Sequence, residues 1–133
     1  MKLAITLASA AVVAMGLLAH AQAPPLFKRT VLQQADISAP GREVVQAAVE
    51  FQPNGTPGRH THPGEEVGYV VDGTVKVEID GKPAMTLTAG QAFLIPANTV
   101  HNATNIGTTN AHLVATYIVE KGKPLATPAP ASK

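Results

Sequence analysis

The side chains best suited to chemistry gather in one short segment, His60-Thr61-His62, which is followed by Glu65 and Glu66. Successive side chains of a strand point to opposite faces, so residues two apart share a face and both imidazoles would point to one place. Two neutral imidazoles and a carboxylate are suitable ligands for a divalent metal of the first transition row. A histidine pair exposed beside a turn is the alternative interpretation, and this segment alone does not exclude it.

A longer pattern surrounds this segment and a second one follows it. Three residues separate His62 from Glu66, and six more separate Glu66 from Gly73. The second pattern runs, with fixed spacing, through Gly90, Pro96, Asn98, His101 and Asn105. Residues 54–73 and 90–105 resemble the two conserved motifs of the cupin superfamily, G-x5-H-x-H-x(3,4)-E-x6-G and G-x5-P-x-G-x2-H-x3-N. Cupins are small jelly-roll β-barrels, so the resemblance implies an all-β fold of this type.

The resemblance also implies a metal site. Carried over position by position, it assigns His60, His62, Glu66 and His101 as ligands of a divalent transition metal. It leaves the metal open among Fe, Mn, Ni, Cu and Zn, because the affinity order of these ions is similar for most nitrogen and oxygen sites. Glu66 would also be the catalytic residue, accepting a proton when it loosens from the metal.

Two positions depart from the motifs. Asn54 stands where the first motif opens with glycine, and Asn98 replaces the internal glycine of the second motif. Asparagine is the residue other than glycine that best tolerates a left-handed backbone. We therefore expect these two asparagines to be variations of the turns that leave the implied metal ligands unaffected.

Four other polar residues lie in or near the motifs or on a later strand. Alternation places Glu65 opposite Glu66, in solvent, and turns Arg59 away from the histidine pair, as a surface charge. Asn105 shares a face with His101 and is either a hydrogen-bonding group behind the site or a polar strand end. His112 lies on a later strand whose inward face the pattern does not settle, and a packed or surface role is the simpler interpretation.

The elements that must position these residues are strands. Alternation of period two is plainest in 74–79, where Val75, Val77 and Ile79 face one way, and no helical period of useful length occurs between residues 30 and 122. Asp72-Gly73 and Asp80-Gly81 predict type I′ hairpin turns. Phe51, Tyr69, Phe93 and Tyr117 are expected in the core. The expected strands are 30–35, 43–51, 67–71, 74–79, 84–88, 92–95, 100–105 and 111–120.

The two ends of the chain differ from its middle. Lys2, the apolar run from Leu3 to Ala19 and the small residues Ala19-His20-Ala21 are typical of a secretory signal peptide with cleavage after residue 21. An uncleaved membrane anchor is the alternative. We therefore expect a periplasmic or secreted protein with no stable membrane span after cleavage. The expected order is signal peptide 1–21, N-terminal arm 22–29, barrel 30–122 and a flexible tail, 123–133, rich in Pro and Ala.

The composition excludes several classes of function. Ten Lys and Arg against nine Asp and Glu argue against a nucleic-acid partner, and the absence of cysteine excludes disulfides and thiol catalysis.

Three histidines and one carboxylate would leave open coordination positions, which predicts a metal-dependent enzyme. Within the resembled family this implies a dioxygenase or isomerase acting on a small molecule. A non-catalytic barrel that holds a metal or small ligand is the alternative. Homodimers are common among cupins, and strand exchange at residues 30–50 could provide the contact.

Overall fold

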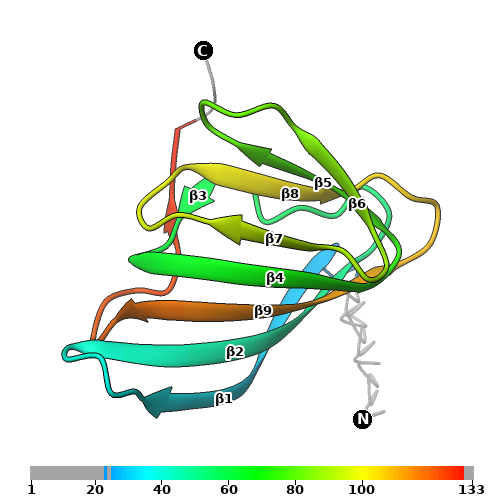
Figure 1. The fold of residues 1–133 in the computed structure, drawn as a ribbon. Helices are drawn as coiled ribbons and strands as arrows, with labels where there is room; N and C mark the ends of the chain where they lie inside the picture. The colour runs from blue at the N-terminus through cyan, green and yellow to red at the C-terminus, as the bar shows by residue number, and fades with distance from the viewer. Residues whose placement is uncertain (1–22, 24, 131–133) are drawn as a thin grey trace, which may run out of the picture.

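The computed structural model describes residue 23 and residues 25–130, which form strands and loops with no helix among them. Ten strands lie in this part of the chain (Figure 1). They are β1 (Phe27–Asp36), β2 (Arg42–Phe51), β3 (His60–Thr61), β4 (Gly64–Asp72), β5 (Thr74–Ile79), β6 (Met85–Thr88), β7 (Ala92–Ile95), β8 (His101–Asn105), β9 (Ala111–Glu120) and β10 (Thr127–Pro128). The expected signal peptide lies outside the described residues. A search of these residues for an apolar helix long enough to span a membrane finds none.

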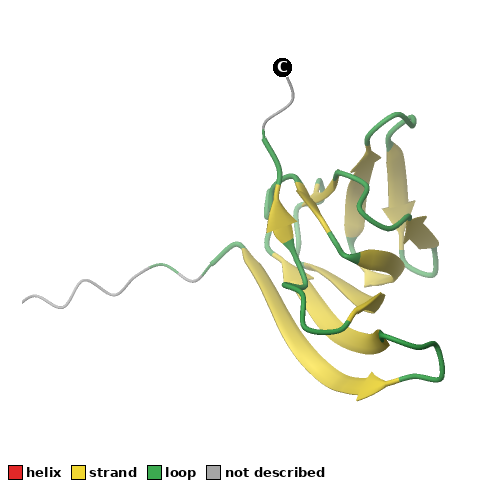
Figure 2. Ribbon diagram, turned by 90° about the vertical axis from the view of Figure 1, so that its left-hand side faces the viewer, coloured by secondary structure: helices red, strands yellow, loops and turns green. Residues whose placement is uncertain are grey.

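The strands form two antiparallel sheets of five strands each. One sheet has the order β1-β2-β9-β4-β7 and is called the large sheet, because most of its strands are long. The other has the order β10-β3-β8-β5-β6 and is called the small sheet, because its strands are shorter. The sheets lie face to face as two layers, and the long strands of the large sheet curve (Figures 1 and 2). Apart from the pairs β1–β2 and β5–β6, strands that are consecutive in the sequence lie in different sheets. This arrangement confirms the expected all-β jelly-roll fold.

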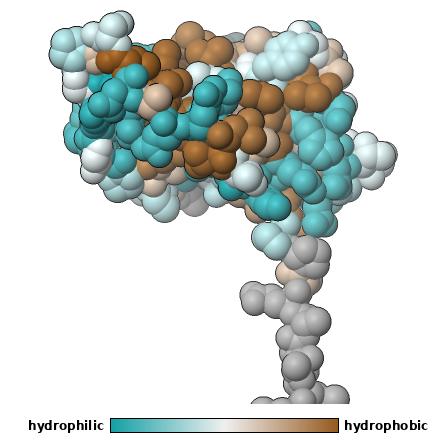
Figure 3. Space-filling view, turned by 90° about the horizontal axis from the view of Figure 1, so that it is seen from below, coloured by the Kyte–Doolittle hydropathy of each residue, from teal (hydrophilic) through white to brown (hydrophobic). Residues whose placement is uncertain are grey.

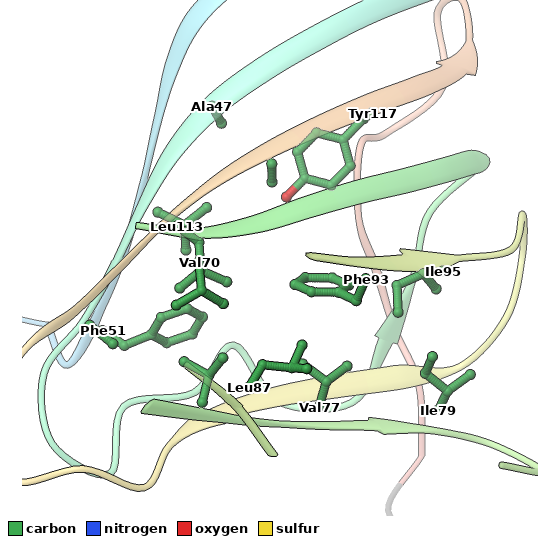
Figure 4. Close-up of a cluster of buried hydrophobic side chains, with 14 of the residues drawn as sticks. Ala47, Phe51, Val70, Val77, Ile79, Leu87, Phe93, Ile95, Leu113 and Tyr117 are labelled. Carbon is green, nitrogen blue, oxygen red and sulfur yellow. The ribbon is translucent and has the colours of Figure 1, made fainter. Parts of the chain in front are cut away.

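The core fills the space between the sheets. Along β9 every second side chain is buried, and Val75, Val77 and Ile79 of β5 are buried as the alternation predicts. Figure 4 shows Val77, Ile79 and Leu87 on one side of the cluster, facing Phe51, Val70 and Leu113 on the other. The inward faces of both sheets are therefore apolar, which holds the two layers together.

The two expected hairpin turns differ from the prediction. Asp72-Gly73 joins β4, which pairs with β9 and β7, to β5, which pairs with β8 and β6, so it is a corner between sheets. Gly73 alone has a positive φ there, of 82°. β5 and β6 do form a hairpin, but its loop covers residues 80–84, and only Gly81 is left-handed. The type I′ prediction was wrong at both places because that turn requires two left-handed residues.

Tyr69 was expected in the core and is instead 49% exposed. It lies on the outward face of β4, where its cross-strand partner on β7 is Ala92. Val67 and Leu94, which pair across the same strands, are also exposed. Apolar side chains gather on the underside of the molecule, where the large sheet lies (Figure 3). This outward face is thus less polar than simple alternation predicts.

The structure also extends the ordered strands at both ends. β1 begins at Phe27, within the segment expected to be an arm. Near the other end, β10 pairs with β3 through Thr127 opposite Thr61 and Pro128 opposite His60. Residues 125–130, expected as part of a flexible tail, therefore lie against the strand that carries the first histidine. Backbone pairing holds them there, which composition alone does not reveal.

Candidate metal site

Three histidines and one glutamate meet between the two sheets. His60 lies on β3 directly opposite His101 on β8, and His62 follows β3 in the sequence. Glu66 lies on β4, in the large sheet. All four side chains are buried, and nitrogen atoms of the three histidines lie within 4.8 Å of one another. The structure thus brings together the four residues that the resemblance to the cupin motifs implies as ligands.

The distances among these atoms suit a shared ion. Nε2 of His60 lies 3.2 Å from Nε2 of His62. Oε2 of Glu66 lies 3.1 Å from Nε2 of His62 and 3.2 Å from Nε2 of His101. Ligand atoms about 2.1 Å from a transition metal, at roughly right angles, lie about 3 Å apart. The cluster therefore has the spacing of adjacent metal ligands.

Each histidine is oriented by a backbone carbonyl. Nδ1 of His60 lies 2.7 Å from Gly58 O, and Nδ1 of His101 lies 2.9 Å from Thr99 O. Nδ1 of His62 lies 2.5 Å from Leu125 O. A carbonyl only accepts, so each Nδ1 carries the proton, and in a neutral ring Nε2 then has a free lone pair. This is the orientation that metal-binding histidines adopt.

One buried nitrogen lacks a partner. Nε2 of His101 is near Glu66 but makes no aligned hydrogen bond with any described residue. A buried polar atom without a partner is unfavourable, and a cation would satisfy it. Together with the three free lone pairs, this atom shows that the donor set fits a divalent transition metal.

The protonation states also suit a metal. Burial lowers the pKa of His60 to about 4, and the neighbouring His101 and His62 act in the same direction. Burial alone would raise the pKa of Glu66, and positive charge beside the carboxylate, on His101 and His62 when they donate from Nε2 or on a bound cation, lowers it. At neutral pH His60 is therefore neutral and Glu66 ionised, as metal ligands must be.

The sequence around the ligands explains how the strands come together. A Cβ atom at Gly64 would lie 1.9 Å from Ile118 O, so only glycine lets the start of β4 approach β9. Asn98, which is left-handed with a φ of 56°, donates its backbone N–H to His62 O at 2.9 Å. The loop before β8 is thus tied to the histidine pair on which the site depends.

Both departures from the motifs behave as expected. Asn54 and Asn98 are the two left-handed residues other than glycine in the described chain. The glycine next to Asn54 has its own reason, because a Cβ atom at Gly55 would lie 2.1 Å from Leu26 O. The turn therefore keeps an asparagine where a left-handed residue is needed and a glycine where the backbone is crowded.

The roles that the sequence left open are resolved by contacts. Asn105 is fully buried, and its amide donates to Phe51 O at 3.1 Å and to Thr109 O at 2.7 Å, so it is a structural hydrogen-bonding group. His112 lies on the outward face of β9, with Nδ1 2.7 Å from Asp72. It is a surface residue away from the cluster. Arg59 is partly exposed and paired with Asp80, and Glu65 is partly buried on the face opposite Glu66.

Two residues near the cluster were not predicted from the sequence to lie at the site. Tyr117 was assigned only to the core, yet it lies opposite Glu66 on the neighbouring strand, and its ring centroid is 4.7 Å from that of His62. Arg29 was placed in the N-terminal arm, yet it lines the same cavity as His60, Glu66 and His101. Both meet the site through strand pairing between distant segments, for which the sequence holds no local signal.

Two cavities adjoin the cluster. The inner one has a volume of about 20 Å³ and is lined by residues that include Arg29, His60, Glu66 and Tyr117. That is the space of about one water molecule. An outer cleft of about 180 Å³ shares Arg29 and His60 with it and is also lined by Arg59. The space next to the proposed ligands is thus very small, and the room for a small ligand lies in the outer cleft, on the side of Arg29.

Comparison with known families agrees with this geometry. The sequence profile of the cupin domain matches residues 47–120, more than half of the 133 residues. The chain belongs to the cupin family. Oxalate oxidase 2 of Hordeum vulgare is 35% identical to this cupin over 77 residues, which cover 52% of the chain and 34% of the relative. The match thus spans about a third of the length of that relative.

Solved structures show the same fold. A recombinant oxalate oxidase in complex with glycolate matches this cupin with a TM-score of 0.64 and 28% identity, over 80% of this chain and 56% of the other. KdgF from Halomonas sp. matches with a TM-score of 0.61 and 22% identity, over 77% of this chain and 86% of the other. The second likeness shows the fold alone.

Proposed function

We propose that this cupin is a metal-dependent enzyme, of the oxidoreductase type, that acts on a small organic molecule. One observation carries the proposal: three buried histidines turn their Nε2 atoms, at ligand spacing, toward one point beside the Glu66 carboxylate. The proposed ligands are His60, His62, Glu66 and His101. The similarity to oxalate oxidases supports oxalate and related acids as the first substrates to test.

The proposed ligands, the backbone carbonyls behind them and Glu66 would have different roles. A divalent ion held by the four ligands would supply open coordination positions and Lewis acidity, and Fe, Mn, Ni or Cu would add redox chemistry. The three backbone carbonyls keep the imidazoles in their metal-binding orientation. Glu66 would be a weak base while it is held as a metal ligand. It would become an efficient proton acceptor only when it loosens from the metal, since efficient bases have a pKa near the working pH.

The test is a turnover screen. Metal-free protein is loaded separately with Fe, Mn, Ni or Cu and mixed with oxalate, catechols or flavonols, while oxygen uptake and product are measured. We expect turnover for at least one pair of metal and substrate. It should be lost in His101→Ala and retained in His112→Ala, which changes a surface histidine. Absence of turnover in every pair would contradict the enzymatic proposal.

A second candidate function is a barrel that retains a metal without turnover. The inner cavity favours it, because about 20 Å³ leaves little room for a substrate beside the ligands. This alternative predicts stoichiometric metal that resists dialysis, together with an inactive turnover screen. The two functions therefore share a metal site and differ in the result of one assay.

We also propose that the protein is exported and forms a homodimer. The signal-peptide pattern of residues 1–21 supports export to the periplasm or the medium. Mass spectrometry of the mature protein should find an N-terminus at Gln22.

β1 supports the dimer, because it is an edge strand of the large sheet and most of its residues are exposed. Strand exchange at residues 30–50 would pair this edge, and light scattering would measure the mass.

A further inference from the structure

Arg29 lies between the metal cluster and solvent. It is on β1 opposite Val49, a buried residue of β2, so its side chain turns inward. The carbon at the centre of its guanidinium lies 5.4 Å from the ring centroid of Tyr117 and 5.5 Å from that of Phe27. These two aromatic rings hold the cation in place. Arg29 also lines both the inner cavity and the outer cleft.

The guanidinium has no anionic partner among the described residues. Its Nε is buried and makes no hydrogen bond to any of them, and none of their carboxylates lies within 4.0 Å of it. Arg59, the other arginine of the outer cleft, is different. Its Nη1 and Nη2 donate to the two carboxylate oxygens of Asp80 at 2.8 and 2.7 Å, and its Nε donates to Pro130 O. Of the two arginines that line this cleft, Arg29 is therefore the one without an ion pair among the described residues.

The chemistry of the Arg29 guanidinium favours a carboxylate as its ligand. A guanidinium is a planar fork of donors that matches a carboxylate with two parallel hydrogen bonds. The Nε atom of Arg29 is buried without a partner, and leaving a buried donor unpaired is unfavourable, so a carboxylate that accepts from Nε is favoured there.

We propose that Arg29 binds a carboxylate of a small organic acid whose other end faces the histidine cluster. The inference rests on the proposed function and names its substrate class. The two cavities share Arg29 and His60, so a short acid can meet the guanidinium with one end and the cluster with the other. The outer cleft, of about 180 Å³, limits the ligand to a few carbon atoms. A dicarboxylate is the simplest compound that satisfies both ends.

The experiment separates the carboxylate at Arg29 from the one at the metal. Zinc-loaded protein is titrated calorimetrically with oxalate, malonate and succinate, and with the monoamide of each. The monoamide keeps one carboxylate for the metal and replaces the other by a neutral group of similar shape. For the diacid whose length fits the cleft, the wild type should bind the diacid about tenfold or more tightly than its monoamide. This is the usual contribution of a charge-assisted hydrogen bond to affinity. Arg29→Gln should abolish this preference.

Two further variants complete the set. Arg29→Lys keeps the charge without the fork and should restore part of the preference. Lys28→Gln removes a neighbouring charge on the exposed, opposite face of β1 and should change nothing. Persistence of the preference in Arg29→Gln, or its absence from the wild type at every length, would overturn the inference. So would inorganic phosphate that binds at Arg29 as tightly as the best diacid.

The zinc content keeps this result apart from the proposed function. Each protein is dialysed and analysed for zinc before the titrations. Failure of the wild type to retain zinc would overturn the metal site, and with it the proposed function. Retained zinc without a preference that depends on Arg29 would overturn only the carboxylate assignment.

Discussion

At the scale of single residues, the site depends on which nitrogen of each histidine is free. The carbonyls of Gly58, Thr99 and Leu125 accept from the three Nδ1 atoms, so all three lone pairs turn toward one point. Without a cation this arrangement would place lone pairs and a carboxylate against each other in a buried space, which is unfavourable. The residues are therefore preorganised for a cation.

Removal of a ligand should abolish tight binding. His60→Ala or His101→Ala should weaken metal affinity by more than about 100-fold, since loss of even an outer partner costs 10–100-fold. His112→Ala, on the outward face of β9, should change it little. Competition with a chromophoric chelator measures all three affinities. Equal losses at the three positions would show that the assignment of faces is incorrect.

Acid should release the metal and weaken the metal-free fold. Imidazoles bind metals only when neutral, and their ordinary pKa is about 6.5, so metal content should fall steeply below about pH 6. In the metal-free protein the pKa of His60 is about 4, below its unfolded value, so the unfolded chain binds more protons between these values. The free energy of unfolding should therefore decrease as pH falls from 6.5 to 4. Metal analysis and urea titrations across this range test both statements.

Retention of metal down to pH 4 would contradict the three-histidine site. His60→Gln supplies the control for stability, because glutamine does not titrate. Its free energy of unfolding, without metal, should depend less on pH in the same window. A metal-free wild type whose stability is constant or increases toward pH 4 would show that His60 is not held neutral.

The site residues that were predicted from the sequence share one property: they lie in two short segments with the spacing of known motifs. His60, His62, Glu66 and His101 stand at fixed intervals in motif segments, and the left-handed turns at Asn54 and Asn98 follow from the backbone preference of asparagine. Arg29 stands more than 30 positions before these histidines and meets them only because β1 pairs with β2. Such a meeting depends on tertiary pairing, which no local pattern encodes.

At the scale of elements, the segment after β9 supports the site. β10 pairs with β3, Ala129 donates its backbone N–H to Arg59 O at 2.9 Å, and Leu125 O accepts from His62. These contacts use mainly backbone atoms. The composition of this segment, rich in Pro and Ala, therefore predicts a flexible tail and does not indicate the pairing. The same reason explains the misjudged corner at Asp72-Gly73, where the local signal is a turn but the partner strands decide which sheet follows.

Deletion of residues 124–133 should weaken metal binding. The deletion removes the carbonyl that orients His62 and leaves β3 without one neighbour. We expect affinity to fall by about 10–100-fold, the usual effect of losing an outer partner. Chelator competition measures the change. Deletion of residues 131–133 alone is the matched control and should leave affinity unchanged; equal affinities in the two truncated proteins would show that the segment does not support the site.

At the scale of the whole molecule, the proposed ligands join the two sheets. His60 and His101 belong to the small sheet and Glu66 to the large one, so an ion bound by all of them links the layers at one place. Such a link exists only in the folded protein. Binding to the folded state alone stabilises it in proportion to the logarithm of metal concentration over the dissociation constant.

Metal removal should therefore lower the melting temperature of the whole domain. At a metal concentration of about 1,000 times the dissociation constant the stabilisation is about 4 kcal/mol. A domain of about 100 residues shifts by roughly 4 °C or more for each kcal/mol, so chelation should lower Tm by more than about 10 °C. Scanning calorimetry with and without chelator measures the shift. In His101→Ala the chelator should have little effect, because the ion no longer connects β8 to β4; a wild-type Tm that does not respond to metal would mean that the two sheets are held together by their apolar faces alone.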